Sequence, residues 1–334
     1  YVLDLVVNGC VNTMPEATLD AVAQGGDFRG DTVTGTAAES QQVWDDLAAL
    51  GIDRQVDQAV ARAGSKSFEA RRAESKARGK LRGIGVGCFL ETSRGAPNEG
   101  AEVRFGVDGK VTIAVGTESN GQGHETAFAQ VASDHFGLPI GTFRYVQADT
   151  REVKSGAGHG GARSMHMGGA ALVKAMDAAL AKARELAAHL LQAKMEELDY
   201  SGGRFTVRGS DRNIDFASLA RSAGELGSTL DTHVMNMTDV FTFPSGCHVA
   251  EVEIDPETGA VQLLRYTAVD DYGRLINPLL TEGQVQGGVA QGIGQALLEE
   301  NVYDRESGQL LTGSFMDYAM PRADTSPTFS NTLD

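Results

Sequence analysis

Apolar residues recur along this chain with two different periods. In six stretches they alternate with polar residues or glycine at every second position, which is typical of strands with one buried face. We therefore expect strands at residues 81–90, 102–105, 111–115, 143–147, 248–254 and 260–269. Asp108-Gly109 predicts a two-residue hairpin turn between the second and third stretches, because this dipeptide tolerates positive φ angles.

Other stretches repeat their apolar residues every three or four positions, which predicts helices with one buried face. One such face runs from Phe128 to Phe136, and Gly137 ends it. A longer helix is expected from Ser164 to about Leu198. Shorter helices are expected at residues 40–50, at residues 64–79, after Asp215, and from a capping box formed by Thr281 and Gln284.

The order of strand, tight turn, strand and helix occurs twice, once around Gln122 and once around Gln291. Together the elements predict an α+β fold: two α/β subdomains with mixed sheets and packed helices that face a shared cleft. The two glutamines are expected to converge on that cleft.

The composition describes a globular, acidic protein. Of its 334 residues 41% are apolar, enough for a sizeable core, and the net charge is −16. An acidic surface repels phosphate backbones, so nucleic acid and anionic membranes are not expected as partners. No apolar run approaches the roughly 20 residues of a membrane span. We expect a cytoplasmic protein, and a piece of a longer chain because it begins with Tyr1.

Charged, cysteine and histidine residues offer little specific chemistry. The basic residues between Arg62 and Arg82 predict a solvated helix with surface salt bridges. Asp270 and Asp271 predict a turn or a favourable charge at a helix start. Disulfides and metal sites are not expected, because none of the spacings matches a known ligand pattern among Cys10, Cys88, Cys247, His124, Glu125, His159 and His166. His135 is expected in the core.

Glycines cluster around both glutamines, in Gly121-Gln122-Gly123 and between Gly287 and Gly294. Each glycine inside a helix costs about 1 kcal/mol relative to alanine, so their number requires a compensating reason. Close approach of the backbone to a large flat partner would supply it. A third glycine-rich loop, residues 156–164, could bind an anion or could be a mere connection.

A glutamine amide is a neutral donor and acceptor that suits a ligand already rich in negative charge. For a single glutamine, capping a turn is the simpler explanation. Two glutamines in matching structural positions favour the functional interpretation.

Three motifs together resemble the cofactor-binding elements of molybdenum hydroxylases, the family of xanthine dehydrogenase and aerobic carbon monoxide dehydrogenase large subunits. They are residues 121–126, the loop that ends in Ala162-Arg163-Ser164, and residues 287–294. The resemblance extends over residues 55–334. It implies molybdopterin, in its cytosine dinucleotide form, with molybdenum held by the pterin rather than by protein side chains. The residues implied to bind this cofactor are Gly121, Gln122, Gly123, Gly161, Ala162, Arg163, Ser164 and Gln291.

Within that set, the resemblance implies that Gln122 and Gln291 hydrogen-bond the molybdenum oxo group or the pterin. It implies that residues 161–164 bind the phosphates of the cofactor. The family often has serine where Ala162 stands. By the same resemblance residues 1–54 are a poorly matched N-terminal segment, and residues 55–245 and 246–334 are a first and a truncated second molybdopterin-binding subdomain.

The resemblance further implies oxidative hydroxylation of carbon monoxide, an aldehyde or an N-heterocycle in the intact complex, with a glutamate as general base. The family's Gly-Val-Gly-Glu element, which carries that glutamate, does not occur in this sequence. No catalytic residue is therefore assigned. Implied partners are the remainder of the large subunit and iron–sulfur and FAD centres on other chains or domains, and a homodimer is left open.

Two alternatives remain compatible with the residues. One is a non-catalytic, truncated relative that keeps the fold without the cofactor. The other is an unrelated nucleotide-binding module that uses loop 156–164. Analysis for molybdenum and phosphorus discriminates among the three.

Overall fold

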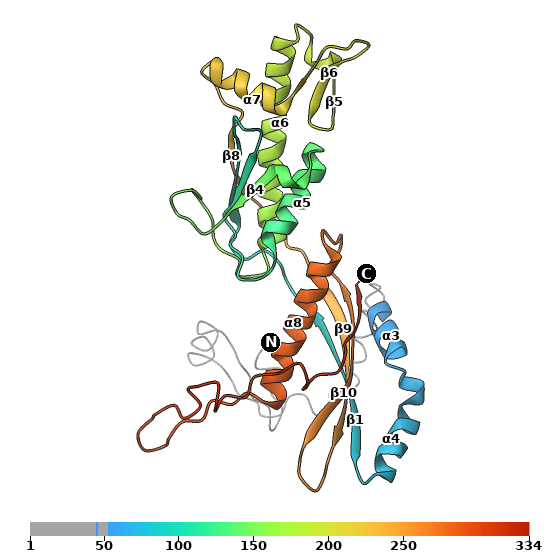
Figure 1. Cartoon of the computed structure of the whole chain (residues 1–334). Helices are drawn as coiled ribbons and strands as arrows, with labels where there is room; N and C mark the ends of the chain where they lie inside the picture. Colours follow the sequence, from blue (N-terminus) through green and yellow to red (C-terminus); the bar gives the residue numbers. More distant parts are fainter. Residues whose placement is uncertain (1–44, 46–52, 334) are drawn as a thin grey trace.

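The computed structural model describes residue 45 and residues 53–333, which form two lobes joined by a narrow waist (Figure 1). The helix expected at residues 40–50 lies outside the described residues apart from Asp45. None of the described helices is long and apolar enough to cross a membrane.

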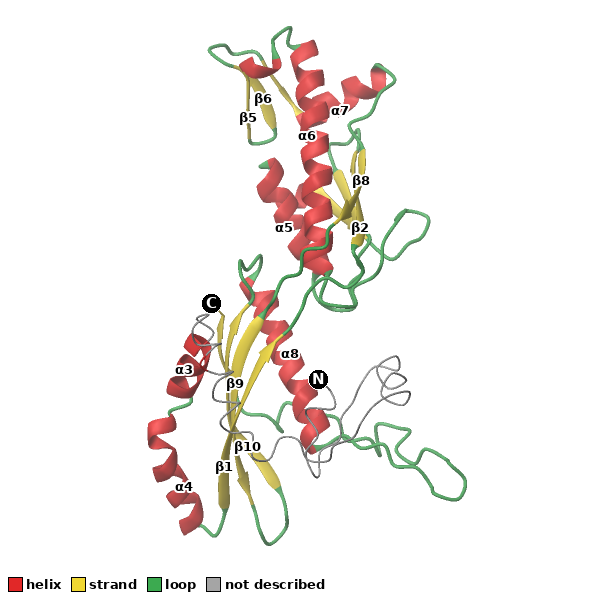
Figure 2. Cartoon of the chain, turned by 180° about the vertical axis from the view of Figure 1, so that it is seen from behind, coloured by secondary structure: helices red, strands yellow, loops and turns green. Residues whose placement is uncertain are grey.

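The lower lobe is built on a four-stranded mixed sheet with strand order β1-β9-β10-β11. Its strands are β1 (Leu81–Leu90), β9 (Ser245–Ile254), β10 (Val261–Asp271) and β11 (Ser330–Leu333). β11 is parallel to β10, and the other pairs are antiparallel. Figure 2 shows helices on both sides of this sheet: α3 (Asp53–Arg62) and α4 (Phe68–Ala77) on one, and α8 (Pro278–Leu297) on the other.

Successive side chains of β9 point to opposite faces of the sheet, and this explains how helices pack on both faces. Cys247 and Val249 pack with Ala59 of α3, while Ala250 packs with Val285 of α8 on the opposite face. The alternating side chains of β9 therefore contact α3 on one face of the sheet and α8 on the other.

The upper lobe contains a second mixed sheet with strand order β4-β3-β2-β8. Its strands are β2 (Asn98–Phe105), β3 (Val111–Val115), β4 (Phe143–Val146) and β8 (Thr232–Met237). Its helices are α5 (His124–Phe136), α6 (Ala170–Leu190) and α7 (Phe216–Glu225). A small antiparallel sheet follows α6, with strands β5 (Leu198–Ser201), β6 (Arg204–Val207) and β7 (Asn213–Asp215). Single turns of 3₁₀-helix lie at Ser65–Ser67, Ile140–Thr142 and Met195–Glu197.

Small residues let α6 lie close on the upper sheet. Five fully buried alanines repeat every fourth position along this helix: Ala171, Ala175, Ala179, Ala183 and Ala187. Beyond them, aromatic rings fill the larger space, with Phe105 and Phe216 stacked at 5.2 Å between ring centroids.

Two segments, residues 91–97 and 238–244, connect the lobes and pair through a bridge between Ser93 and Thr242. The lobes also meet where the start of α8 contacts α5. The side-chain amide of Asn277, just before α8, donates to Gln130 Oε1 of α5 at 2.8 Å. This contact places the start of α8 beside α5.

These sheets and helices confirm the α+β prediction, and a strand forms in each of the six stretches expected. The domain boundary at residue 245 stays a prediction. By their sheets, however, residues 53–90 and 245–333 share the lower lobe, and residues 98–237 form the upper one.

Several predicted helix and turn bounds are wrong. Gly64, with φ 67°, and a 3₁₀ turn interrupt the helix expected at residues 64–79 before α4 starts. The long helix ends at Leu190 rather than Leu198, because the chain turns at Gln192, whose φ is 50°.

The other two errors concern a cap and a turn. α8 starts at Pro278, where Asn277 Oδ1 accepts a hydrogen bond from Leu280 N–H, so Thr281 and Gln284 do not cap it. Residues 106–110 form a longer hairpin loop, because only Gly109, and not Asp108, has a positive φ.

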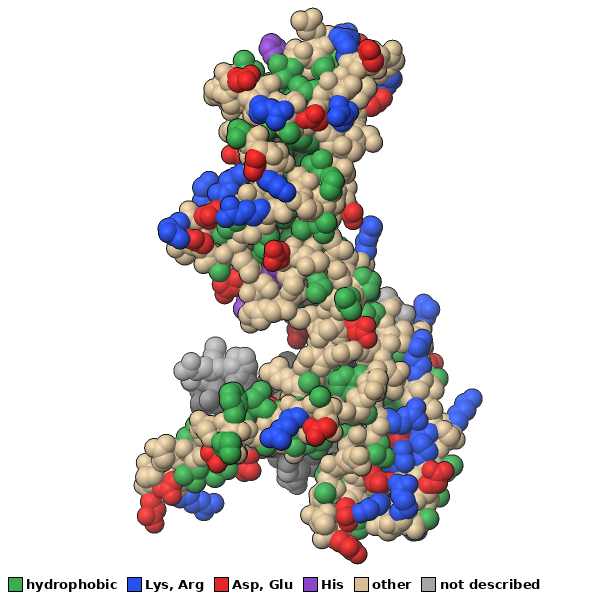
Figure 3. Space-filling view, viewed as in Figure 1, with side chains coloured by type: hydrophobic (Ala, Val, Ile, Leu, Met, Phe, Trp, Pro, Cys, Tyr) green, Lys and Arg blue, Asp and Glu red, His purple; other side chains and the backbone are tan. Residues whose placement is uncertain are grey.

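The basic residues between Arg62 and Arg82 are not merely solvated. Arg71 and Arg82 flank the buried Glu251 of β9 at 2.8 and 2.5 Å. The ion pair of Arg71 attaches α4 to the sheet, and that of Arg82 adds a side-chain link between β1 and β9. The space-filling view shows the interleaved charges over this side of the lower lobe (Figure 3).

Candidate functional site

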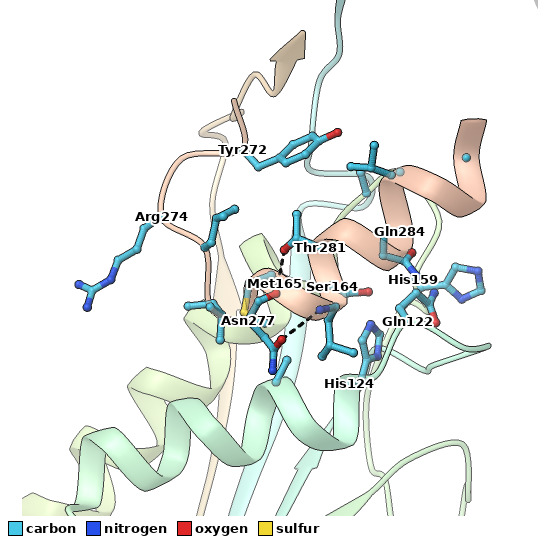
Figure 4. A pocket seen from close by; sticks show the side chains of 18 of the residues that line it. Gln122, His124, His159, Ser164, Met165, Tyr272, Arg274, Asn277, Thr281 and Gln284 are labelled. Atoms are coloured by element: carbon cyan, nitrogen blue, oxygen red, sulfur yellow. Dashed lines mark hydrogen bonds between the residues drawn. The ribbon is translucent and has the colours of Figure 1, made fainter. Parts of the chain in front are cut away.

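A cavity of about 770 Å³ lies where the two lobes meet. The start of α5, loop 159–165, the first turns of α8 and the segment after β10 all contribute side chains to it (Figure 4). Its volume lies within the usual range for small-molecule and cofactor sites.

Gln122 is placed by the sharp entry into α5. Gly123 has φ 77°, which favours glycine, and a Cβ there would lie 2.7 Å from a terminal methyl group of Leu280, which would have to move. The Gln122 Oε1 atom accepts hydrogen bonds from Ser119 Oγ at 3.1 Å and from Asn120 N–H at 2.6 Å. Its Nε2 has no partner among the described residues and is free to donate into the cavity.

His124 is the first residue of α5 and is only 4% exposed, yet it lines the cavity. Its Nδ1 has no hydrogen-bond partner among the described residues. Burial lowers the pKa of His124, and the neighbouring His159 lowers it further. The imidazole is thus neutral near pH 7 and offers an uncompensated polar atom to a ligand.

The lowered pKa of His124 predicts a pH-dependent stability. In the unfolded chain a histidine has a pKa of about 6.5, so below that pH the unfolded chain binds a proton that folded His124 does not. The stabilisation is complete above this value and is lost as the pH falls towards the folded pKa. We expect the free-energy gap between wild type and His124→Asn, measured by denaturant unfolding, to narrow from about pH 7.5 to about pH 5.5. A constant gap would contradict this assignment.

The glycine-rich loop opposite α5 forms the next wall. Gly161 has φ 89°, and a Cβ there would lie 2.8 Å from Gly95 Cα. Ala162 also has a positive φ, 51°, which is unusual for a residue with a side chain. The loop leads into a π-helical turn, Ser164–Gly169, that continues as α6. The Ser164 hydroxyl lines the cavity without a partner among the described residues.

The structure thus brings Gln122, Gly161, Ala162 and Ser164 to one cavity, with Gly121 and Gly123 on either side of Gln122. It does not bring Arg163 or Gln291 there. Arg163 is fully buried behind the loop.

Gln291 is exposed in the middle of an unbroken α8, whereas Gln284 lines the cavity. Gln291 follows Gln284 by seven positions, so it lies on the same helix face about 10 Å farther along.

The remaining wall was missed from the sequence. His248 of β9 lines the cavity, and its Nε2 lies 2.9 Å from Asp270 Oδ1 while its Nδ1 lies 2.8 Å from the Tyr266 hydroxyl. Asp270 is fully buried, so its prediction as a turn or helix-start residue is wrong. Asp271 does form a turn, since it accepts a hydrogen bond from Gly273 N–H at 2.8 Å. The only sequence signal was the unusual Asp-Asp pair at a strand end.

Two other predictions concern residues outside this wall. His135 is only partly buried and lies 3.0 Å from Asp177, at the edge of the core rather than within it. Cys88 and Cys247 are free thiols that face each other across β1 and β9.

The donor set suits an anionic organic ligand. Within residues 53–333 no cluster of three or more His, Cys, Asp or Glu side chains could hold a metal ion. The polar groups that line the cavity are amides, hydroxyls, the imidazoles of His124, His159 and His248, and the guanidinium of Arg274. The N-terminus of α5 adds free N–H groups that favour negative charge.

A family model described as a molybdopterin cofactor-binding domain matches residues 58–327. The chain belongs to this molybdopterin cofactor-binding family. Its sequence is 34% identical over 259 residues to the 6-hydroxypseudooxynicotine dehydrogenase complex subunit gamma of Paenarthrobacter nicotinovorans, covering 75% of this chain and 32% of that protein. It is 32% identical over 283 residues to the carbon monoxide dehydrogenase large chain of Hydrogenophaga pseudoflava, covering 78% and 35%.

Among solved structures, quinoline 2-oxidoreductase from Pseudomonas putida 86 matches with a TM-score of 0.76 and 31% identity, over 84% of this chain and 38% of that one. The resemblance to molybdenum hydroxylase large subunits is thereby confirmed, and the alternative of an unrelated nucleotide-binding module is wrong. The chain spans about a third of the length of the relatives it matches.

Proposed function

We propose that this chain binds the molybdenum cofactor in the cavity between its lobes, as the later cofactor-binding part of a molybdenum hydroxylase large subunit. The observation that carries the proposal is the convergence of Gln122, His124 and Ser164 on one cavity of about 770 Å³, where the buried Nδ1 of His124 has no hydrogen-bond partner among the described residues. Buried polar atoms normally have partners, so this buried nitrogen, next to the amide of Gln122 and the hydroxyl of Ser164, supports a polar ligand there.

In this proposal Gln122 donates through Nε2 to the cofactor, and its Oε1 is already held by the preceding turn. Gly161, Ala162 and Ser164 form the wall that faces the cofactor's phosphate. Gly121 and Gly123 set the path of the chain, with Gly123 leaving room for Leu280. Binding by Gln291 stays a prediction, and its exposed position on α8 lends it no support.

When bound, the cofactor would supply the two-electron chemistry of hydroxylation. The chain's own residues orient it and keep water from part of its surface. From the names of its relatives, we propose a substrate class of carbon monoxide or N-heterocycles. From the resemblance to the family, we propose aldehydes as a further substrate class, a cytosine dinucleotide form of the cofactor, and electron transfer to iron–sulfur and FAD partners. No residue of this chain is proposed as the catalytic base.

The test is elemental and nucleotide analysis of the purified protein, prepared with all the sequence and subunits it carries in the cell. We expect molybdenum and phosphorus in fixed proportion, about one molybdenum and two phosphates per chain for a dinucleotide form. Acid release should yield a cytidine nucleotide. Protein with neither element would instead support a non-catalytic relative that keeps the fold without the cofactor.

A further inference from the structure

Arg163 comes directly after Ala162, which lines the cavity, yet its own side chain is completely buried. A guanidinium carries five N–H donors, and all five are used inside the protein. Four go to backbone carbonyls at 2.5 to 3.3 Å, and one goes to a carboxylate. The acceptors are the carbonyls of Arg94, Ala96, Asn98 and Gly158 and the side chain of Glu99. No donor of Arg163 remains for a ligand.

Glu99 is equally buried and equally satisfied. Its Oε2 accepts from Arg163, and its Oε1 accepts from the N–H of Gly100 at 2.9 Å. Each charge therefore compensates the other in a site without water access. A buried ion pair often adds little net stability, because desolvation offsets the attraction, but removal of one partner leaves the other charge uncompensated.

The pair connects two segments that form no regular strand pairing with each other. Residues 94–99 lead from the lower lobe into β2, and residues 158–163 are the glycine-rich wall of the cavity. Their backbones touch: a Cβ on Gly95 would lie 2.5 Å from Gly160 O, and Arg94 N–H donates to Gly161 O at 3.2 Å. Arg163 supplies the donors that this irregular contact lacks.

We propose that Arg163 and Glu99 form a buried clasp that fixes loop 158–164 to the segment between the lobes. Arg163 is then a positioning residue for the cavity and not a direct ligand of phosphate. The inference deepens the proposed function, on which its effect on cofactor binding rests. The clasp itself is a property of the protein without the cofactor.

The decisive variant is Arg163→Lys, because lysine keeps the charge opposite Glu99 but cannot reach four carbonyls from one nitrogen. Glu99→Gln serves as a second variant that keeps Arg163. The matched control is Arg82→Lys, since Arg82 is also a nearly buried arginine paired with a carboxylate, Glu251, on the lower sheet. In each, amide hydrogen exchange, thermal unfolding and molybdenum content are measured on the protein with its full sequence and subunits.

We expect Arg163→Lys to speed exchange in residues 156–164 by about tenfold or more in cofactor-free protein, and to lower molybdenum content. Arg82→Lys should lower the unfolding temperature without either effect. Unchanged exchange in residues 156–164 in both Arg163→Lys and Glu99→Gln would overturn the clasp. Wild-type protein without molybdenum would overturn the proposed function alone, and the exchange result would still decide on the clasp.

Discussion

Gly161→Ala is expected to cost about 2 to 5 kcal/mol of unfolding free energy and most of the bound cofactor. About 1 to 2 kcal/mol comes from placing a Cβ at a left-handed φ, here 89°. The remainder, about 1 to 3 kcal/mol, comes from overpacking, because the new Cβ would lie 2.8 Å from Gly95 Cα, which is backbone and cannot rotate away. Denaturant unfolding and molybdenum content measure the two effects.

Gly209→Ala is the matched control for this variant. Gly209 has φ 75°, a Cβ added there would meet nothing within 4 Å, and it lies in the hairpin between β6 and β7. It should therefore show only the conformational part of the cost and retain the cofactor. Equal losses of stability in the two variants would show that the contact with Gly95 is unimportant.

Gln122→Ala is expected to weaken cofactor binding by about 10- to 150-fold, which corresponds to the 1.5 to 3 kcal/mol typical of a hydrogen bond to a charged group. The physical reason is that Gln122 Nε2 is the side-chain donor left free by the turn before α5. Molybdenum content of the purified protein, and the rate at which molybdenum is lost on dilution, measure the effect.

Gln122→Glu separates binding from turn formation. Its carboxylate can still accept from Ser119 and Asn120, so the turn is kept, but the donor is replaced by a negative charge beside an anionic ligand. We expect a loss of cofactor at least as large as for alanine, with an unchanged fold by circular dichroism. Gln286→Ala, an exposed glutamine on α8 bonded to Glu282, should retain the cofactor. Full molybdenum content in both Gln122 variants would show that Gln122 does not bind the cofactor.

Local sequence signals predicted a large part of the fold. The stretches with alternating apolar residues formed strands because a period of two places the apolar side chains on one face of a strand. This holds whichever element packs against that face. Gly121-Gln122-Gly123 and Gly137 bounded α5 because left-handed backbone angles are accessible to glycine without strain. The same residues led to the cofactor family, since the motif and the turn are one local structure.

Predicted site roles were less reliable where they depended on contacts with residues far away in the sequence. Gln291 belonged to a motif as suggestive as that of Gln122, but its distance from the cavity depends on where α8 begins. That start is set by the Asn277 cap and by the contact of Asn277 with Gln130 of the other lobe. Arg163 likewise had the chemistry of a phosphate ligand, and only the position of Glu99 shows its donors to be occupied.

From its residues alone, this protein could be recognised as an α+β chain with two strand–helix units, glycine-shaped loops and a molybdenum hydroxylase pattern. Those properties reside in consecutive residues, where spacing and backbone freedom are enough. The cavity itself, the buried Arg163–Glu99 pair and the contact of His248 with Asp270 were decided by tertiary structure. Each of them joins separate elements, and the register and packing that bring these side chains together are not encoded in any single stretch of sequence.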